Sequence, residues 1–169
     1  MQKRFMPVLL AVITAQAAAT EVQVKVEIPR LAVAEYHRPY VAIWIENAEG
    51  HVADLSVWYD LKLRDREGEK WLKDMRQWWR RSGRALELPV DGLSGATRPA
   101  GEHSLHFASD HPALQALAPG EYQLLIEAAR EVGGRELVRV PFSWPASNAL
   151  THQQSGTSEL GRITLNLQP

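Results

Sequence analysis

A short segment rich in small residues, VDGLSGATRPAG at positions 90–101, contains the side chains best suited to chemistry. Thr97, which carries a hydroxyl, follows Gly92, Gly95 and Ala96. These three residues have almost no side-chain bulk, so a reactant could approach the hydroxyl unhindered. Asp91 could orient a metal ion or accept the proton of that hydroxyl, as a general base does. The alternative is a Gly/Ser/Thr turn that only caps the next strand. Thr97 is therefore either a turn residue or a chemical handle.

Other side chains give little indication of catalysis or metal binding. His103 and His106 lie three positions apart on an expected strand, so they would point to opposite faces and could not share a metal ion. The remaining histidines are scattered near turns, without the spacing typical of metal ligands; they are His37, His51, His111 and His152. G-x-S-x-G is absent, and no Ser-His-Asp order can be recognised. We expect no metal site and no catalytic residues.

The N-terminal segment has the pattern of a secretory signal peptide. Lys3 and Arg4 precede an apolar run at 6–13, and small residues allow cleavage after Ala17 or Ala19. The run is far shorter than the roughly 20 residues that a membrane-spanning helix needs. The alternative is an uncleaved N-terminal anchor. We expect residues 1–19 to be a signal peptide, 20–169 to be one exported domain, and the mature protein to be periplasmic.

Composition narrows the class of protein further. The formal net charge of −1 gives no indication of a nucleic-acid partner or an anionic membrane surface. The chain has no cysteine, so an exported protein of this sequence must be held together by its core alone. The same absence excludes thiolate metal sites, iron–sulfur clusters and a C-x-x-C-H haem attachment. Redox function would need another kind of cofactor.

Apolar residues recur mainly with a period of two, which is typical of strands half-buried in a sheet. The segment YVAIWIE at 40–46 is apolar on both faces, as a central strand would be. Turn signals rich in Gly and Pro separate the expected strands. The remaining expected strands are 22–28, 55–63, 102–107, 121–129, 137–144 and 161–167. This spacing predicts a mostly β protein, an Ig-like antiparallel β-sandwich.

One segment, WLKDMRQWWRR at 71–81, breaks that period. Its apolar residues fall at helical spacing and cover a stripe of roughly 120°, with the basic residues outside it. Ser82 and Gly83 provide a plausible helix end. The pattern predicts one amphipathic helix inserted into the sandwich. Its tryptophans would cover one open end of the sandwich, unless some of them bind a ligand.

The segment Asp91-Gly92-Leu93-Ser94-Gly95-Ala96-Thr97 resembles the flavinylation motif D-G-x-S/T-G-A-T/S. That motif occurs in FMN-binding domains and in the sodium-translocating NADH:quinone reductase. The resemblance implies that a magnesium-dependent flavin transferase moves FMN from FAD onto the final hydroxyl, here Thr97, as a phosphoester. It covers only these seven residues, and every defining position matches: Asp91, Gly92, Ser94, Gly95, Ala96 and Thr97.

A second resemblance spans most of the mature chain. The stretches RPYVAIWIEN, KWLKDMRQWWRR, SGATRPAGE and GEYQLLIEAARE are similar to the periplasmic domain-of-unknown-function 2271 family. Together the two resemblances imply an extracytosolic electron carrier with covalent FMN, modified by a separate flavin transferase and not itself an enzyme. Its partners would be a membrane-bound reductase and a periplasmic electron acceptor.

A tethered flavin would still need protein contacts to place its ring and set its potential. Aromatic faces stack on such rings and cations stabilise the reduced anion, so Trp78 and Trp79 near Arg80 are candidate contacts. Arg98 would pair with the new phosphodiester. Tyr40 and Trp44 are further candidates. The alternative function is a cofactor-free Ig-like module that binds or scaffolds another envelope protein.

Overall fold

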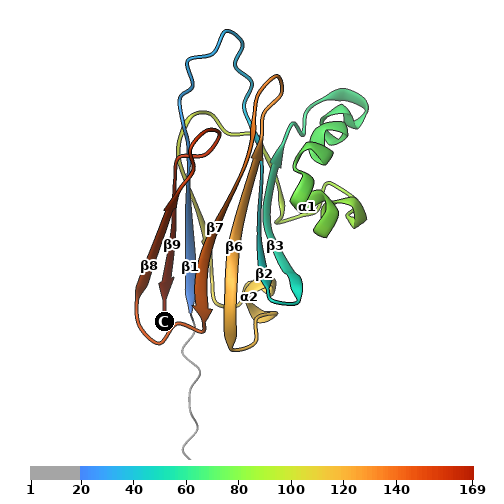
Figure 1. Ribbon diagram of the computed structural model, residues 1–169. Coiled ribbons are helices and arrows are strands. Elements are labelled where there is room, and N and C mark those ends of the chain that lie inside the picture. Colours follow the sequence, from blue (N-terminus) through green and yellow to red (C-terminus); the bar gives the residue numbers. More distant parts are fainter. Residues whose placement is uncertain (1–19) are drawn as a thin grey trace, which may run out of the picture.

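The computed structural model describes residues 20–169, which form two β-sheets packed face to face (Figure 1). The strands are β1 (Glu21–Ile28), β2 (Tyr40–Asn47), β3 (Gly50–Tyr59), β4 (Ser94–Ala96), β5 (Gly101–Phe107), β6 (Gly120–Ala129), β7 (Arg135–Trp144), β8 (Leu150–Ser155) and β9 (Arg162–Gln168). The helical elements are η1 (Arg64–Asp74), α1 (Arg76–Arg81), η2 (Gly83–Ala85) and α2 (Pro112–Gln115). The expected mostly β sandwich is confirmed, whereas the expected signal peptide and its cleavage sites after Ala17 or Ala19 lie outside the described residues.

The sandwich consists of a four-stranded and a five-stranded sheet. The first has the order β5-β1-β9-β8, and the second has the order β4-β3-β2-β6-β7. All pairs are antiparallel except β3 with β4, which is parallel. The sequence had not indicated β4 or β8, and the strand expected to reach residue 63 ends at Tyr59. After Tyr59 the chain turns at residues 61–63 and enters η1 at Arg64.

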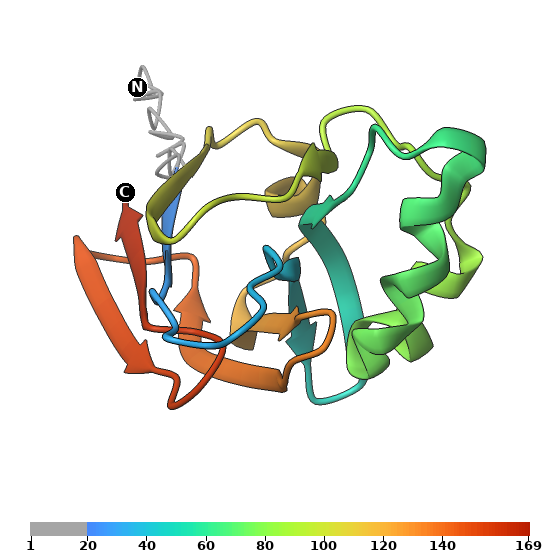
Figure 2. The same ribbon diagram turned by 90° about the horizontal axis from the view of Figure 1, so that it is seen from above.

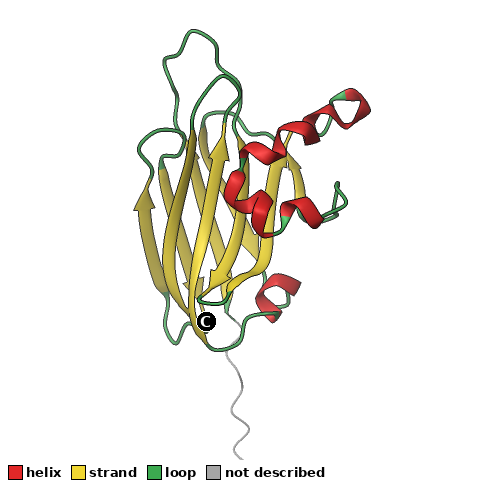
Figure 3. Ribbon diagram, turned by 45° about the vertical axis from the view of Figure 1, so that its right-hand side comes forward, coloured by secondary structure: helices red, strands yellow, loops and turns green. Residues whose placement is uncertain are grey.

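Two apolar clusters bury the two faces of the five-stranded sheet. The larger cluster fills the space between the sheets and includes Val24, Ile43 and Ile126. The smaller lies on the outer face of the five-stranded sheet, where Trp44 and Tyr59 meet Trp78 from α1. Figures 2 and 3 show η1, α1 and η2 packed against this outer face. Because these elements cover the outer face, both faces of β2 are buried, which explains why β2 is apolar on both sides.

The helical segment, here residues 64–85, corrects two sequence-based expectations. The helix predicted over 71–81 is interrupted at Met75, whose φ of −78° and ψ of 73° separate η1 from α1. The segment covers the outer face of a sheet rather than an open end of the sandwich. Leu72, Met75 and Trp78 form its buried face, whereas the side chain of Trp71 remains 45% exposed.

Candidate functional site

The turn that precedes β4 uses several motif residues for its own architecture. Gly92 has a φ of +73°, a conformation that most side chains disfavour. The Ser94 hydroxyl accepts a hydrogen bond from the Val90 N–H at 3.0 Å, which closes the turn. The Leu93 carbonyl accepts one from the Val57 N–H at 2.9 Å, which ties the turn to β3.

Strand β4 brings the end of the motif alongside β3. Its three residues pair with Val57–Tyr59, and the Thr97 N–H then donates to the Tyr59 carbonyl at 3.2 Å. A Cβ atom on Gly95 would lie 3.3 Å from Cδ1 of Trp58, so a larger residue would press against that indole. Ala96 is exposed and Thr97 is partly exposed. The segment is therefore extended and at the surface, while backbone bonds hold Thr97 in place.

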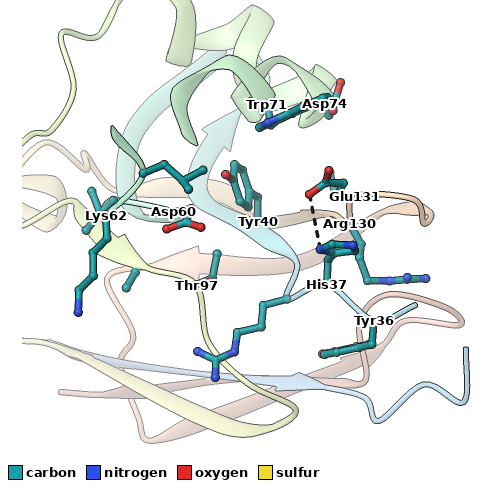
Figure 4. A pocket seen from close by; sticks show the side chains of 15 residues that line it. Tyr36, His37, Tyr40, Asp60, Lys62, Trp71, Asp74, Thr97, Arg130 and Glu131 are labelled. Carbon is teal, nitrogen blue, oxygen red and sulfur yellow. Dashed lines mark ion pairs between the residues drawn. The ribbon is translucent and has the colours of Figure 1, made fainter. Parts of the chain in front are cut away.

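Thr97 lines a cavity of about 460 Å³ at the end of the five-stranded sheet where β2 begins and β3, β4 and β6 end (Figure 4). This volume falls within the roughly 300–1,000 Å³ typical of small-molecule sites. Tyr40, Asp60 and Trp71 lie on other parts of its wall. The Thr97 hydroxyl makes no hydrogen bond within residues 20–169. The motif thus ends in an uncommitted hydroxyl that faces a cavity.

Exposed apolar side chains gather around this cavity. Seven large hydrophobic side chains are exposed among the described residues, and four of them line the cavity. The four are Tyr36, Leu61, Leu63 and Trp71. Single exposed apolar residues are ordinary, whereas a cluster on one concave surface is typical of a binding site.

The cationic side chains of the cavity differ in how they are paired. Arg130 is buried and forms two bonds to Glu159, at 2.8 and 3.1 Å. His37 contacts Glu35 at 2.7 Å and Glu131 at 3.5 Å. Within the part of the chain that the structure describes, Arg38 and Lys62 form no ion pair and no hydrogen bond. These two cations are available to an anionic ligand.

Tyr40 presents a neutral phenol to the cavity. Burial raises the pKa of Tyr40 above its ordinary value of 10.0, and a hydrogen bond from the Asp60 backbone offsets only part of that rise. The negative charges of Asp60 and Glu131 raise it further. The phenol is therefore protonated at neutral pH and can donate a hydrogen bond. The Tyr40 ring also meets that of Tyr59 edge to face, with centroids 6.4 Å apart.

Asp91 is separated from Thr97 by the length of β4. Its carboxylate is exposed and accepts a bond only from the adjacent Gly92 N–H at 3.1 Å. An extended strand rises about 3.3 Å per residue, so Ser94 and Thr97 alone lie about 10 Å apart. In this conformation Asp91 cannot take the Thr97 proton, although an approaching protein can reach it. Three other carboxylates share the cavity with Thr97: Asp60, Asp74 and Glu131.

Arg98 does not line the cavity. Its guanidinium carbon lies 4.3 Å from the centroid of the Trp58 ring, a cation–π contact. Partial burial lowers the pKa of Arg98, which still carries its charge at neutral pH. Within residues 20–169 it has no carboxylate partner. In this arrangement the guanidinium contacts Trp58 and not the cavity where the structure places Thr97.

Trp78 and Trp79, expected as contacts of a flavin ring, lie away from this cavity. Trp78 is completely buried, and its indole N–H donates to the Asp54 carboxylate at 2.9 Å. Trp79 is half-buried and lines a different hollow, together with Lys73 and Arg76. Trp44 is also completely buried, whereas Tyr40 lines the cavity. Trp78 offers no free face to a ligand because it is part of the core.

The sequence reasoning had not assigned Arg38, Lys62 or Trp71 to the site. Trp71 belonged to the predicted apolar stripe, and only the break at Met75 explains its separation from the buried face. Arg38 comes two residues before Tyr40, which had been a candidate. Lys62 lies just past the end of β3, in the turn that precedes η1. Their convergence depends on the chain path, so spacing in the sequence gave no signal for it.

Residues 20–169 contain no group of three or more His, Cys, Asp or Glu side chains placed to hold a metal ion. They also contain no helix that is long and apolar enough to cross a membrane.

Comparison with known proteins gives one match. The model of a family described as "Predicted periplasmic protein (DUF2271)" matches residues 21–162. This range contains the five-stranded sheet, the motif and the whole cavity, and it ends at the first residue of β9. No curated protein and no solved structure matched the chain.

Proposed function

We propose, from the premise that the chain belongs to the DUF2271 family of predicted periplasmic proteins, that it is an electron carrier with FMN esterified to Thr97. One observation carries the proposal: the Thr97 hydroxyl faces a cavity and has no hydrogen-bond partner in the described chain. Gly92, Ser94 and Gly95 have structural reasons to be present, whereas that hydroxyl has none.

The residues around Thr97 fit the group that the motif implies. A phosphoester at its Oγ would place negative charge in a cavity whose Arg38 and Lys62 have no other partner. Tyr40 and Trp71 provide aromatic surface on the same wall. When bound, a flavin accepts and returns one or two electrons, which suits exchange between a membrane-bound reductase and a periplasmic acceptor.

The attachment step balances with FAD as the only co-reactant. The Thr97 Oγ bonds to the phosphorus of the FMN half of FAD, and the pyrophosphate bond to the AMP half breaks. AMP leaves, and the Thr97 proton passes to a base of the magnesium-dependent flavin transferase. Asp91 lies exposed at the other end of β4, where a docking transferase or its metal ion can reach it. The product is a phosphodiester between Thr97 and riboflavin.

The test is co-expression with a flavin transferase in the periplasm, followed by intact-mass and peptide analysis. The chain should gain the mass of one FMN less water on the peptide that contains Thr97. Thr97→Ala should abolish the gain, Thr97→Ser should retain part of it, and Asp91→Ala should lower it. Labelling that persists in Thr97→Ala would contradict the proposal. So would an unlabelled wild type beside a transferase active on another substrate, a result that favours the cofactor-free binding or scaffolding module.

A further inference from the structure

We infer that the cavity beside Thr97 is the binding site of the isoalloxazine ring itself, with Trp71 and Tyr40 as its aromatic contacts and Lys62 and Arg38 as its countercharges. The inference rests on the proposed attachment at Thr97 and adds where the ring lies and which residues set its properties. Trp71 and Tyr40 thus take the place of Trp78 and Trp79, the ring contacts expected from the sequence.

Tethering restricts where the ring can lie. Because Thr97 is part of the cavity wall, any group bonded to its Oγ begins inside the cavity. Its backbone N–H is bonded to the Tyr59 carbonyl at 3.2 Å, so the attachment point is fixed against β3. The other hollow with a tryptophan, beside Trp79, does not include Thr97. The tether therefore gives the ring a higher effective concentration at the Thr97 cavity than at any other surface of the same chain.

The aromatic wall has the exposure that a ligand site requires. Trp71 is 45% exposed, although it lies one residue before the buried Leu72. Tyr40 is partly buried and keeps a neutral hydroxyl. In the view of Figure 4, Trp71 and Thr97 lie on opposite sides of Tyr40. A flat ring entering from Thr97 can therefore pack on Tyr40 and Trp71, removing their apolar surface from water.

Two cations of the cavity would stabilise a ligand that becomes more negative on reduction. Lys62 and Arg38 have no ion pair within residues 20–169; Asp60 and Asp74 of the same cavity have none either, and their charges oppose those of the cations. By contrast, Arg130 is bonded to Glu159 and His37 contacts both Glu35 and Glu131, so each of them already has a carboxylate partner. Unpaired cations at a partly enclosed site stabilise an anion more strongly than they would in open water. Lys62 and Arg38 should therefore favour the reduced flavin.

Flavin fluorescence of the labelled protein tests the position of the ring. In the folded wild type the emission should be several-fold lower than in the same labelled chain unfolded in urea, because ring contacts quench it. Trp71→Leu should recover several-fold emission, while the matched variant Trp79→Leu should leave emission unchanged. The mass gain on Thr97 should be equal in all three proteins, because none of these changes touches the acceptor.

The midpoint potential tests the countercharges. Lys62→Gln and Arg38→Gln should each move the potential of the labelled protein to more negative values. Lys73→Gln removes a charge of the same kind from the other hollow and should not move it. Labelled wild type whose emission does not change on unfolding would overturn this inference while leaving the attachment intact. Equal emission of Trp71→Leu and Trp79→Leu would also overturn it. Absence of the label from wild type would instead defeat the attachment itself.

Discussion

The buried inner face of the helical segment and the Thr97 cavity use neighbouring residues, Leu72 for the first and Trp71 for the second. They differ in how their polar groups are paired. On the inner face, Trp78 donates its indole N–H to Asp54, and the Gln77 and Trp78 N–H groups donate to Glu127. In the cavity, neither the Thr97 hydroxyl nor the charged end of Lys62 has a partner in the described chain.

The difference separates stabilising residues from residues available for binding. A buried polar group that is left unbonded costs free energy, and the Trp78 indole and the Gln77 and Trp78 N–H groups avoid that cost through Asp54 and Glu127. At the cavity, exposure to water removes that cost while the molecule is free, and a ligand can later replace the water. The two regions should therefore respond in opposite ways to mutation: one in the free energy of unfolding, the other in the properties of a bound group.

The largest expected effect on stability is that of Trp78→Ala. Removing this completely buried side chain should lower the free energy of unfolding by about 3–5 kcal/mol. The matched change Trp71→Ala removes a side chain that is 45% exposed and should cost far less. Urea denaturation of both variants measures the difference. Equal destabilisation by the two changes would mean that Trp71 is a core residue, which would contradict the distinction between the buried face and the cavity.

Glu127 should have the next largest effect. Its carboxylate is completely buried and accepts from the Gln77 and Trp78 N–H groups and from Arg135. Glu127→Ala leaves these donors unbonded, which should cost about 1–3 kcal/mol. Glu131→Ala, an exposed glutamate of the cavity, should stay within about 0.5 kcal/mol in the same urea titration. If Glu127→Ala leaves the free energy of unfolding unchanged, the helical segment does not need this anchor.

Gly92 tests whether the turn before β4 is required for the fold. Its φ of +73° should make Gly92→Ala cost about 1–2 kcal/mol, although no atom lies within 4 Å of the added Cβ. Gly92→Asn should cost less, because asparagine tolerates this conformation better. Thermal unfolding of the pair measures the backbone contribution. If alanine and asparagine are equivalent, the positive φ is not a constraint on this turn.

Tyr40 should contribute a smaller effect that depends on pH. Because burial raises its pKa, the folded state holds the phenol proton more tightly than the unfolded chain does. The free energy of unfolding therefore falls as pH rises above 10.0 toward the folded-state pKa. Tyr40→Phe should make this decline above about pH 10 shallower, leaving the part due to Tyr59, whose pKa burial also raises. An unchanged slope in urea titrations would show that Tyr40 behaves as a solvated phenol.

The sequence predicted most of the sandwich because its strands alternate or are continuously apolar. It missed β8, whose residues LTHQQS carry little apolar alternation, and β4, whose three small residues look like a turn. The small residues of the motif predicted an unhindered approach to Thr97, which is partly exposed at the end of the extended β4. It could not predict the cavity, because Arg38, Lys62 and Thr97 converge only through the pairing of β3 with β4 and the turn before η1. The break at Met75, which separates Trp71 from the buried face, depends on tertiary contacts such as that of Glu127.

The most direct test of the central claim is the chemical state of Thr97 in protein purified from the periplasm of its native host. The account predicts a yellow protein whose flavin absorption persists after denaturation, with FMN less water on the Thr97 peptide. The periplasm from which the protein is purified should also contain active flavin transferase, shown by its modification of another substrate. A colourless protein with an unmodified Thr97 peptide, from a host in which that transferase is active, would contradict the account.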